Sequence, residues 1–167
     1  SSRRRHTRFR NVTGVQTCAL PILKDEEIKL AKQLFNECWE YIEKKNRTNE
    51  DNLMMLHLAH ASRFHWGNVG TLKEAAIGEW QCSYVYSLLG FGEPALAHAQ
   101  ASLRMSESFP KPNFLIASAT HALAFASFRI GKLDDAQNLK VKALELLKGV
   151  AEEDAVHIRN QIQDLPF

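Results

Sequence analysis

Hydrophobic residues recur at spacings of three and four along most of the chain from residue 23 onward. The series Ile28, Ala31, Phe35, Cys38 and Ile42 places its members on one face of a helix. No stretch alternates hydrophobic and polar residues over the length of a strand, as a half-buried strand would. The pattern therefore predicts an all-α chain.

Capping residues divide this pattern into about seven helices. Thr48 and Thr71 begin sequences typical of a capping box, and Asn113 is also suited to begin a helix. Gly90 and Gly131 follow hydrophobic runs and predict helix ends. We expect helices over about 25–45, 49–67, 72–89, 93–108, 114–130, 133–147 and 151–163.

A weak internal repeat relates the middle of the chain to its last third. Gly90 and Gly131 are 41 residues apart, and small or apolar residues recur around both, namely Ser83 and Ala124, Ala95 and Ala136, and Leu103 and Leu144. This pattern resembles the helical hairpin of a tetratricopeptide repeat, although that repeat is usually about 34 residues long. The resemblance implies antiparallel helix pairs in a right-handed stack. An ordinary helical bundle with short turns is the alternative.

A second resemblance covers nearly all of residues 23–167. The segments Leu58–Trp66, Gly70–Thr71, Gly78–Gln81 and Val85–Tyr86 resemble a family of small bacterial proteins with a tetratricopeptide-like fold. The resemblance implies the same fold and a bacterial source. It implies no catalytic residues.

The first 22 residues differ in kind from the rest. Residues 2–22 resemble the translation of a short-read sequencing adapter, so we expect 1–22 to be an artefactual, disordered tail of a metagenomic sequence. Residues 23–167 are then a single helical-repeat domain, long enough to bury a core. Without the five arginines of the tail, the chain has 16 basic and 19 acidic residues. This balance argues against nucleic-acid binding.

Cysteine usage and hydropathy indicate a cytoplasmic protein. Cys38 and Cys82 form no CxxC pair, so we expect reduced, packed thiols. No apolar run reaches the 18 residues of a membrane helix. We therefore predict no membrane association and no cofactor.

Two clusters of polar residues are candidate sites. His57 and His60 share a helical face, and Glu79 on the next helix could be a third ligand of the same metal ion. The three are weak candidates, because no Glu-x-x-His motif is present. The second cluster, a possible ligand pocket, consists of Arg63, His65, Trp66 and Glu79. The alternative is a packing joint, in which Arg63 pairs with Glu79 and Trp66 packs on Trp80.

The repeat resemblance also implies a partner-binding groove on the first helix of each hairpin. Its residues are Ile77, Trp80, Tyr84 and Leu88 on the third helix, with Ser118, His121, Phe125 and Arg129 on the fifth. An exposed aromatic groove is typical of a binding surface. The alternative is that the first helix fills the groove through Phe35 and Trp39.

These features predict a non-enzymatic interaction or scaffold module. Its partner is a peptide, a protein helix or a second copy of the chain. One alternative is an enzyme or sensor with a His/Glu metal or ligand site on the second and third helices. Another is an accessory repeat module of a larger bacterial regulator. The chain contains neither a nucleophile elbow nor a phosphate-binding loop.

Overall fold

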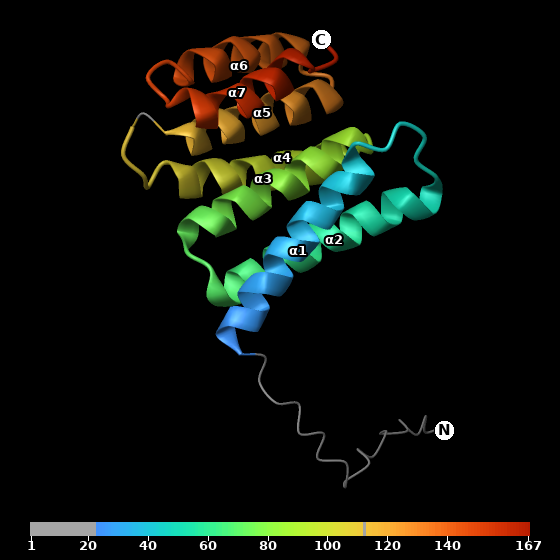
Figure 1. Ribbon diagram of the computed structural model, residues 1–167. Helices are drawn as coiled ribbons and strands as arrows, with labels where there is room; N and C mark the ends of the chain where they lie inside the picture. The colour runs from blue at the N-terminus through green and yellow to red at the C-terminus, as the bar shows by residue number, and fades with distance from the viewer. Residues whose placement is uncertain (1–22, 112) are drawn as a thin grey trace, which may run out of the picture.

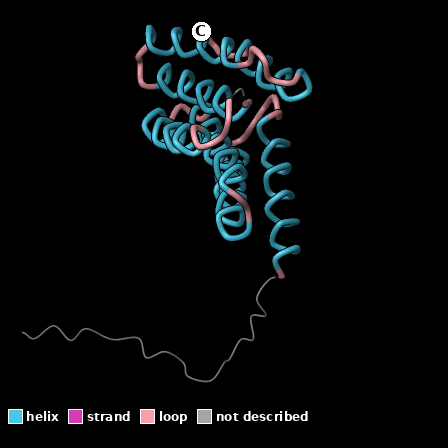
Figure 2. The backbone as a smooth tube through the Cα atoms, turned by 90° about the vertical axis from the view of Figure 1, so that its left-hand side faces the viewer, coloured by secondary structure: helices cyan, strands magenta, loops and turns pink. Residues whose placement is uncertain are grey.

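The structure, a computed structural model, describes residues 23–111 and 113–167. Within these residues it contains seven helices and no strand (Figure 2). The helices are α1 (Lys24–Ile42), α2 (Asn49–Val69), α3 (Leu72–Leu88), α4 (Gly92–Ser106), α5 (Phe114–Arg129), α6 (Leu133–Leu146) and α7 (Glu152–Gln163). The predicted all-α fold is confirmed. The expectation for residues 1–22 concerns a segment outside the described residues.

Three helices begin at the side-chain caps that the sequence predicts. The Thr48 hydroxyl accepts a hydrogen bond from the Asp51 amide (3.2 Å), and the Asp51 carboxylate accepts one from the Thr48 amide (2.8 Å). Thr71 caps α3, and Asn113 accepts from the Ile116 amide (3.1 Å) at the start of α5. Each cap satisfies amides that the helix itself leaves without a partner.

Two of the three glycines predicted to end a helix do so. Gly90 (φ 85°) and Gly131 (φ 81°) adopt the left-handed conformation, as a C-terminal stop requires. The residue after each glycine donates a backbone hydrogen bond to the carbonyl five residues before it. These bonds join Phe91 N to Tyr86 O and Lys132 N to Ser127 O, and both are 2.9 Å long. The predicted end of α2 at Gly67 is wrong. Gly67 lacks a positive φ, so the helix continues to Val69.

The helices pair antiparallel as α1/α2, α3/α4 and α5/α6, and the pairs stack along the molecule, with α7 against α5 (Figure 1). Small residues allow close approach inside and between pairs. Ala95 is fully buried, and its carbonyl accepts a hydrogen bond from the Ser83 hydroxyl (2.8 Å). A Cβ added to Gly92 would lie 2.5 Å from Cγ2 of Ile130. The first contact lies within the α3/α4 pair, and the close approach of Gly92 to Ile130 joins this pair to the α5/α6 pair.

The α1/α2 pair shares a core with α3. Cys38, Met55, Leu58, Cys82 and Val85 are buried there. Both cysteines are free thiols. Burial raises the pKa of Cys38 to about 12, and it also raises the pKa of Cys82, so both stay protonated and serve as packing residues. No helix in the described part of the chain is long and apolar enough to cross a membrane.

Candidate functional site

The predicted groove residues do share one face of α3 and α5, but most of that face is covered. Trp39 of α1 packs on Trp80 and Tyr84, with ring centroids 5.9 Å apart in each case. Trp80 stacks on Tyr84 (5.9 Å), and Tyr84 contacts Phe125 (5.9 Å). Trp80 is only 6% exposed. The C-terminal half of α1 therefore fills this part of the face.

Helix α7 and the C-terminal residues cover the remainder. Ile158 and Ile162 of α7 share a buried cluster with Ala117 of α5, and Leu165 packs on Phe125. Most residues of the predicted groove lie in buried or half-buried core, as in the alternative in which the first helix fills it: Trp80, Tyr84, Leu88, Ser118, His121 and Phe125. Helices α1 and α7, rather than solvent, lie against this face of α3 and α5.

Arg129 and His121 have structural roles on this face. Arg129 donates to the carbonyl oxygen of Ser87 (2.6 Å) and lies over the ring of Phe125 (5.0 Å). His121 is fully buried, and its Nδ1 accepts a hydrogen bond from Trp80 Nε1 (3.4 Å). Burial lowers the pKa of His121 to about 4, so the ring is neutral near pH 7. His121 is therefore enclosed in the core, whereas Arg129 remains exposed.

The residues of the predicted ligand pocket do not form one pocket. Arg63 Nε donates to Glu79 Oε1 (2.8 Å), as the packing-joint alternative expects. His65 Nδ1 instead pairs with Glu27 Oε1 of α1 (3.1 Å). Trp66 lines a cavity on the side of α1, and Trp80 packs on Trp39 rather than on Trp66. Arg63, His65 and Trp66 are close in the sequence of α2, but their side chains face different neighbours.

Glu79 is the centre of a polar cluster formed by α2, α3 and α4. His98 Nδ1 donates to Glu79 Oε2 (2.6 Å), so both carboxylate oxygens have cationic or imidazole partners. Burial opposes the charge of Glu79, but the hydrogen bonds from His98 and Arg63 outweigh it and lower its pKa. The His60 ring lies edge-on to His98 (5.3 Å) and shares a hydrogen bond with the Tyr86 hydroxyl (2.9 Å).

This cluster does not assemble the suggested metal ligands. Glu79 is engaged by Arg63 and His98, while His57 is exposed. Within the described residues, no three His, Cys, Asp or Glu side chains come together in a way that could hold a metal ion. Burial and the neighbouring His98 lower the pKa of His60. What the cluster can do is change its charge when the pH falls.

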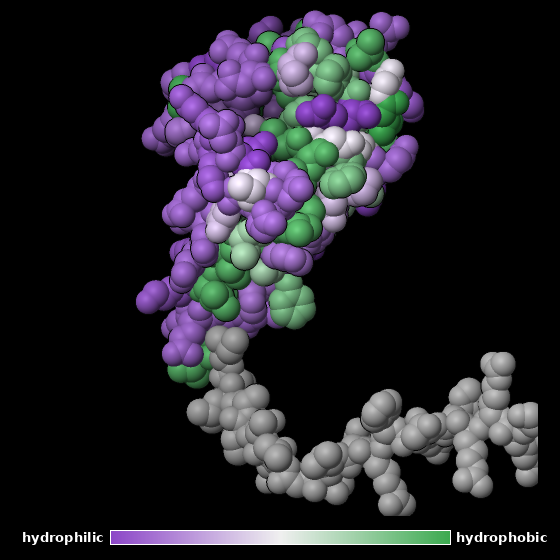
Figure 3. Space-filling model, turned by 90° about the vertical axis from the view of Figure 1, so that its right-hand side faces the viewer, coloured by the Kyte–Doolittle hydropathy of each residue, from purple (hydrophilic) through white to green (hydrophobic). Residues whose placement is uncertain are grey.

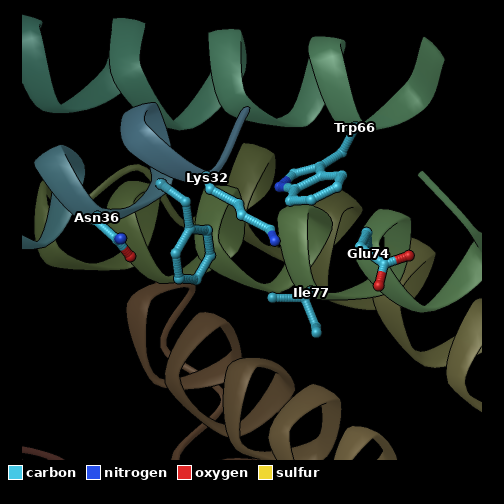
Figure 4. A pocket seen from close by; sticks show the side chains of 6 residues that line it. Lys32, Asn36, Trp66, Glu74 and Ile77 are labelled. Carbon is cyan, nitrogen blue, oxygen red and sulfur yellow. The ribbon is translucent and has the colours of Figure 1, made fainter. Parts of the chain in front are cut away.

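An open cavity of about 300 Å³ lies between the middle of α1, the C-terminal end of α2 and the N-terminal half of α3. Figure 4 shows Lys32 and Trp66 directed toward one another above Ile77, with Asn36 and Glu74 at the two ends. Phe35 completes the lining. Sequence reasoning missed Lys32 and Asn36 as site residues. Their spacing of four on one helix is the signal that was available.

A second, smaller cavity adjoins the first at Ile77. Its volume is about 60 Å³, and its lining is almost entirely apolar. Trp80 and Phe114 belong to α3 and α5, and Ile158 comes from α7. We call the two adjoining cavities the α1–α7 groove, because α1 borders one end and α7 the other. Of the predicted groove residues, Ile77, Trp80 and Ser118 line these cavities.

The rest of the surface mixes apolar and polar residues. On the face in Figure 3, hydrophobic residues form a band from the lower tip toward the upper right, with polar residues beside it. Exposed apolar side chains include Leu53 (57%), Phe64 (64%) and Phe91 (53%). No protein-family model matches the chain, and none of the curated proteins shows significant similarity to it.

Proposed function

We propose that the chain is a non-enzymatic interaction module of tetratricopeptide-like type that holds a segment of a partner protein in the α1–α7 groove. The observation that carries this proposal is the pair of mostly apolar cavities that are both lined by Ile77. Concave, mostly apolar sites with a few polar groups at the edge are typical of binding sites.

The repeated hairpins support the tetratricopeptide-like part of the proposal. The turns at Gly90 and Gly131 have the same backbone conformation and the same closing hydrogen bonds. Helix α5 contacts both α3 and α4 of the preceding pair, as stacked repeats do. In such stacks the first helix of each pair faces the binding surface, and α1, α3 and α5 all contribute residues to the α1–α7 groove.

Selection of peptides from a random 12-residue library displayed on phage tests the proposal on the full chain. We expect enriched peptides that bind the wild-type protein and lose binding when Asn36→Trp or Ile77→Trp obstructs the larger cavity. Asn36 is exposed, so the first variant keeps the core intact. Lys142→Trp on the exposed face of α6 is the matched control. Enriched peptides that bind Asn36→Trp and Ile77→Trp as well as wild type would overturn the proposal.

A proton-responsive sensor is a second candidate, favoured by the contact between His60 and His98 across α3. Burial and the neighbouring His98 disfavour a positive charge on His60 and lower its pKa, so acidification should separate α2 from α4. Spin labels at the exposed positions Met54 and Gln100, read as a distance distribution at pH 7.5 and pH 5.0, test this candidate. An unchanged distance would contradict it, and His60→Gln should abolish any change.

A further inference from the structure

We infer that the segment held in the α1–α7 groove is acidic and carries one bulky apolar side chain. The inference rests on the proposed function and adds the chemistry of the partner. It follows from two properties of the groove, its division into a larger and a smaller apolar cavity and the identity of the charged groups at its edge.

The volumes limit what the groove can take. The larger cavity, about 300 Å³ and partly open to solvent, is at the lower limit for a small-molecule site. Its lining by Phe35, Trp66 and Ile77 fits a single aromatic or large aliphatic side chain. The smaller cavity, about 60 Å³, has space only for a small apolar group. Burial of apolar surface in these two cavities is the source of affinity.

The charges that remain available at the edge are positive. Lys32 reaches into the larger cavity (Figure 4), and the Lys73 ammonium lies over the Phe114 ring beside the smaller one, 5.5 Å from its centroid. Neither lysine takes part in an ion pair within the described part of the chain. Asn36 adds a neutral amide at the mouth.

The one acid in the lining is already engaged. Glu74 accepts a hydrogen bond from the Thr71 amide (2.8 Å) as part of the cap of α3. Burial opposes its charge, but the bonds from Thr71 outweigh burial and lower the pKa of Glu74. The charges of Lys32, Lys73 and Glu74 therefore sum to +1. Carboxylates of a partner would meet two ammonium groups on either side of the apolar contact, and such complementarity determines which segments bind.

The phage library tests the inference when it is applied to charge-reversed protein. We expect peptides enriched on wild type to combine an aromatic or large aliphatic residue with flanking Asp or Glu. On Lys32→Glu/Lys73→Glu, enrichment should shift to peptides with flanking Lys or Arg. The control Lys132→Glu/Lys142→Glu makes the same change of net charge on exposed residues near and on α6, and it should leave the selected sequences unchanged.

A synthetic copy of the most enriched peptide then gives a magnitude. Its Kd, measured by fluorescence anisotropy, should rise about tenfold in the doubly reversed protein and should rise with ionic strength in wild type. Apolar peptides without an acidic preference that still lose binding to Asn36→Trp would overturn the inference and leave the proposed function in place. Peptides indifferent to Asn36→Trp and Ile77→Trp would overturn the proposed function itself. Circular dichroism confirms that each variant is folded.

Discussion

Acidification should destabilise the chain mainly through His121. The ring has no exposed surface, and its Nδ1 accepts the indole proton of Trp80. Burial lowers its pKa to about 4, whereas the pKa of an unfolded-chain histidine is about 6.5. The folded protein therefore binds this proton less readily than the unfolded chain does. The neutral ring contributes stability that is fully present above pH 6.5 and is lost as the pH falls toward 4.

The two pKa values set the size of the effect. A difference of about 2.5 pKa units corresponds to ~3 kcal/mol, because each unit is worth about 1.4 kcal/mol. That is a large share of the 5–15 kcal/mol by which domains are typically stable. The carboxyl groups with lowered pKa values, such as Glu79 and Asp51, contribute at lower pH, as the pH falls through their unfolded values near 4. Between pH 6.5 and 5, the change in stability should therefore come from histidine.

Urea unfolding at intervals between pH 7 and 4.5 measures this dependence. We expect the free energy of unfolding of wild type to fall steeply across the window and that of His121→Gln to fall much less. His157→Gln, an exposed control on α7, should follow wild type. His60→Gln should remove a smaller part, because the pKa of His60 is lowered in the same sense. Equal slopes for wild type and His121→Gln would refute the reasoning.

Three further substitutions have expected magnitudes. Trp80→Ala removes a nearly buried ring that contacts Trp39 and Tyr84, so it should cost about 3–5 kcal/mol in urea unfolding; a loss near 1 kcal/mol would mean that the site is effectively open. Gly131→Val places a β-branched residue at φ 81° and should cost at least ~1–2 kcal/mol, and a melting temperature equal to wild type would contradict this. Thr48→Ala removes the cap of α2 and should cost about 1 kcal/mol, whereas the exposed Gln137→Ala should have little effect.

Features that depend on a few neighbouring residues could be predicted from the sequence. A capping box of Thr followed three residues later by Asp or Glu forms its hydrogen bonds within one turn, and the caps at Thr48 and Thr71 lie where the pattern places them. The turns at Gly90 and Gly131 follow because the glycine ends a hydrophobic run. Gly67 failed as a helix end because glycine permits a stop without requiring one.

Features that depend on the angle between distant helices could not be predicted. The sequence places Arg63, His65 and Trp66 within one turn, but successive residues of a helix point about 100° apart. Arg63 therefore reaches Glu79 of α3, while His65 reaches Glu27 of α1. The relative placement of α1 and α3, which both line the larger cavity, depends on contacts between distant parts of the chain, such as that of Trp39 with Trp80. No local pattern encodes that placement.

We interpret the polar groups of the described residues as suited to holding a partner rather than to catalysis. A general base needs a proton affinity near the working pH and access to substrate. Glu79 has neither, since two partners hold its carboxylate and lower its pKa. His121 is neutral but enclosed in the core. At the groove, Glu74 caps a helix, which leaves Lys32 and Asn36 beside an apolar floor. Such a site gains its free energy from burial and its selectivity from charge, and this combination favours the interaction module over the enzyme.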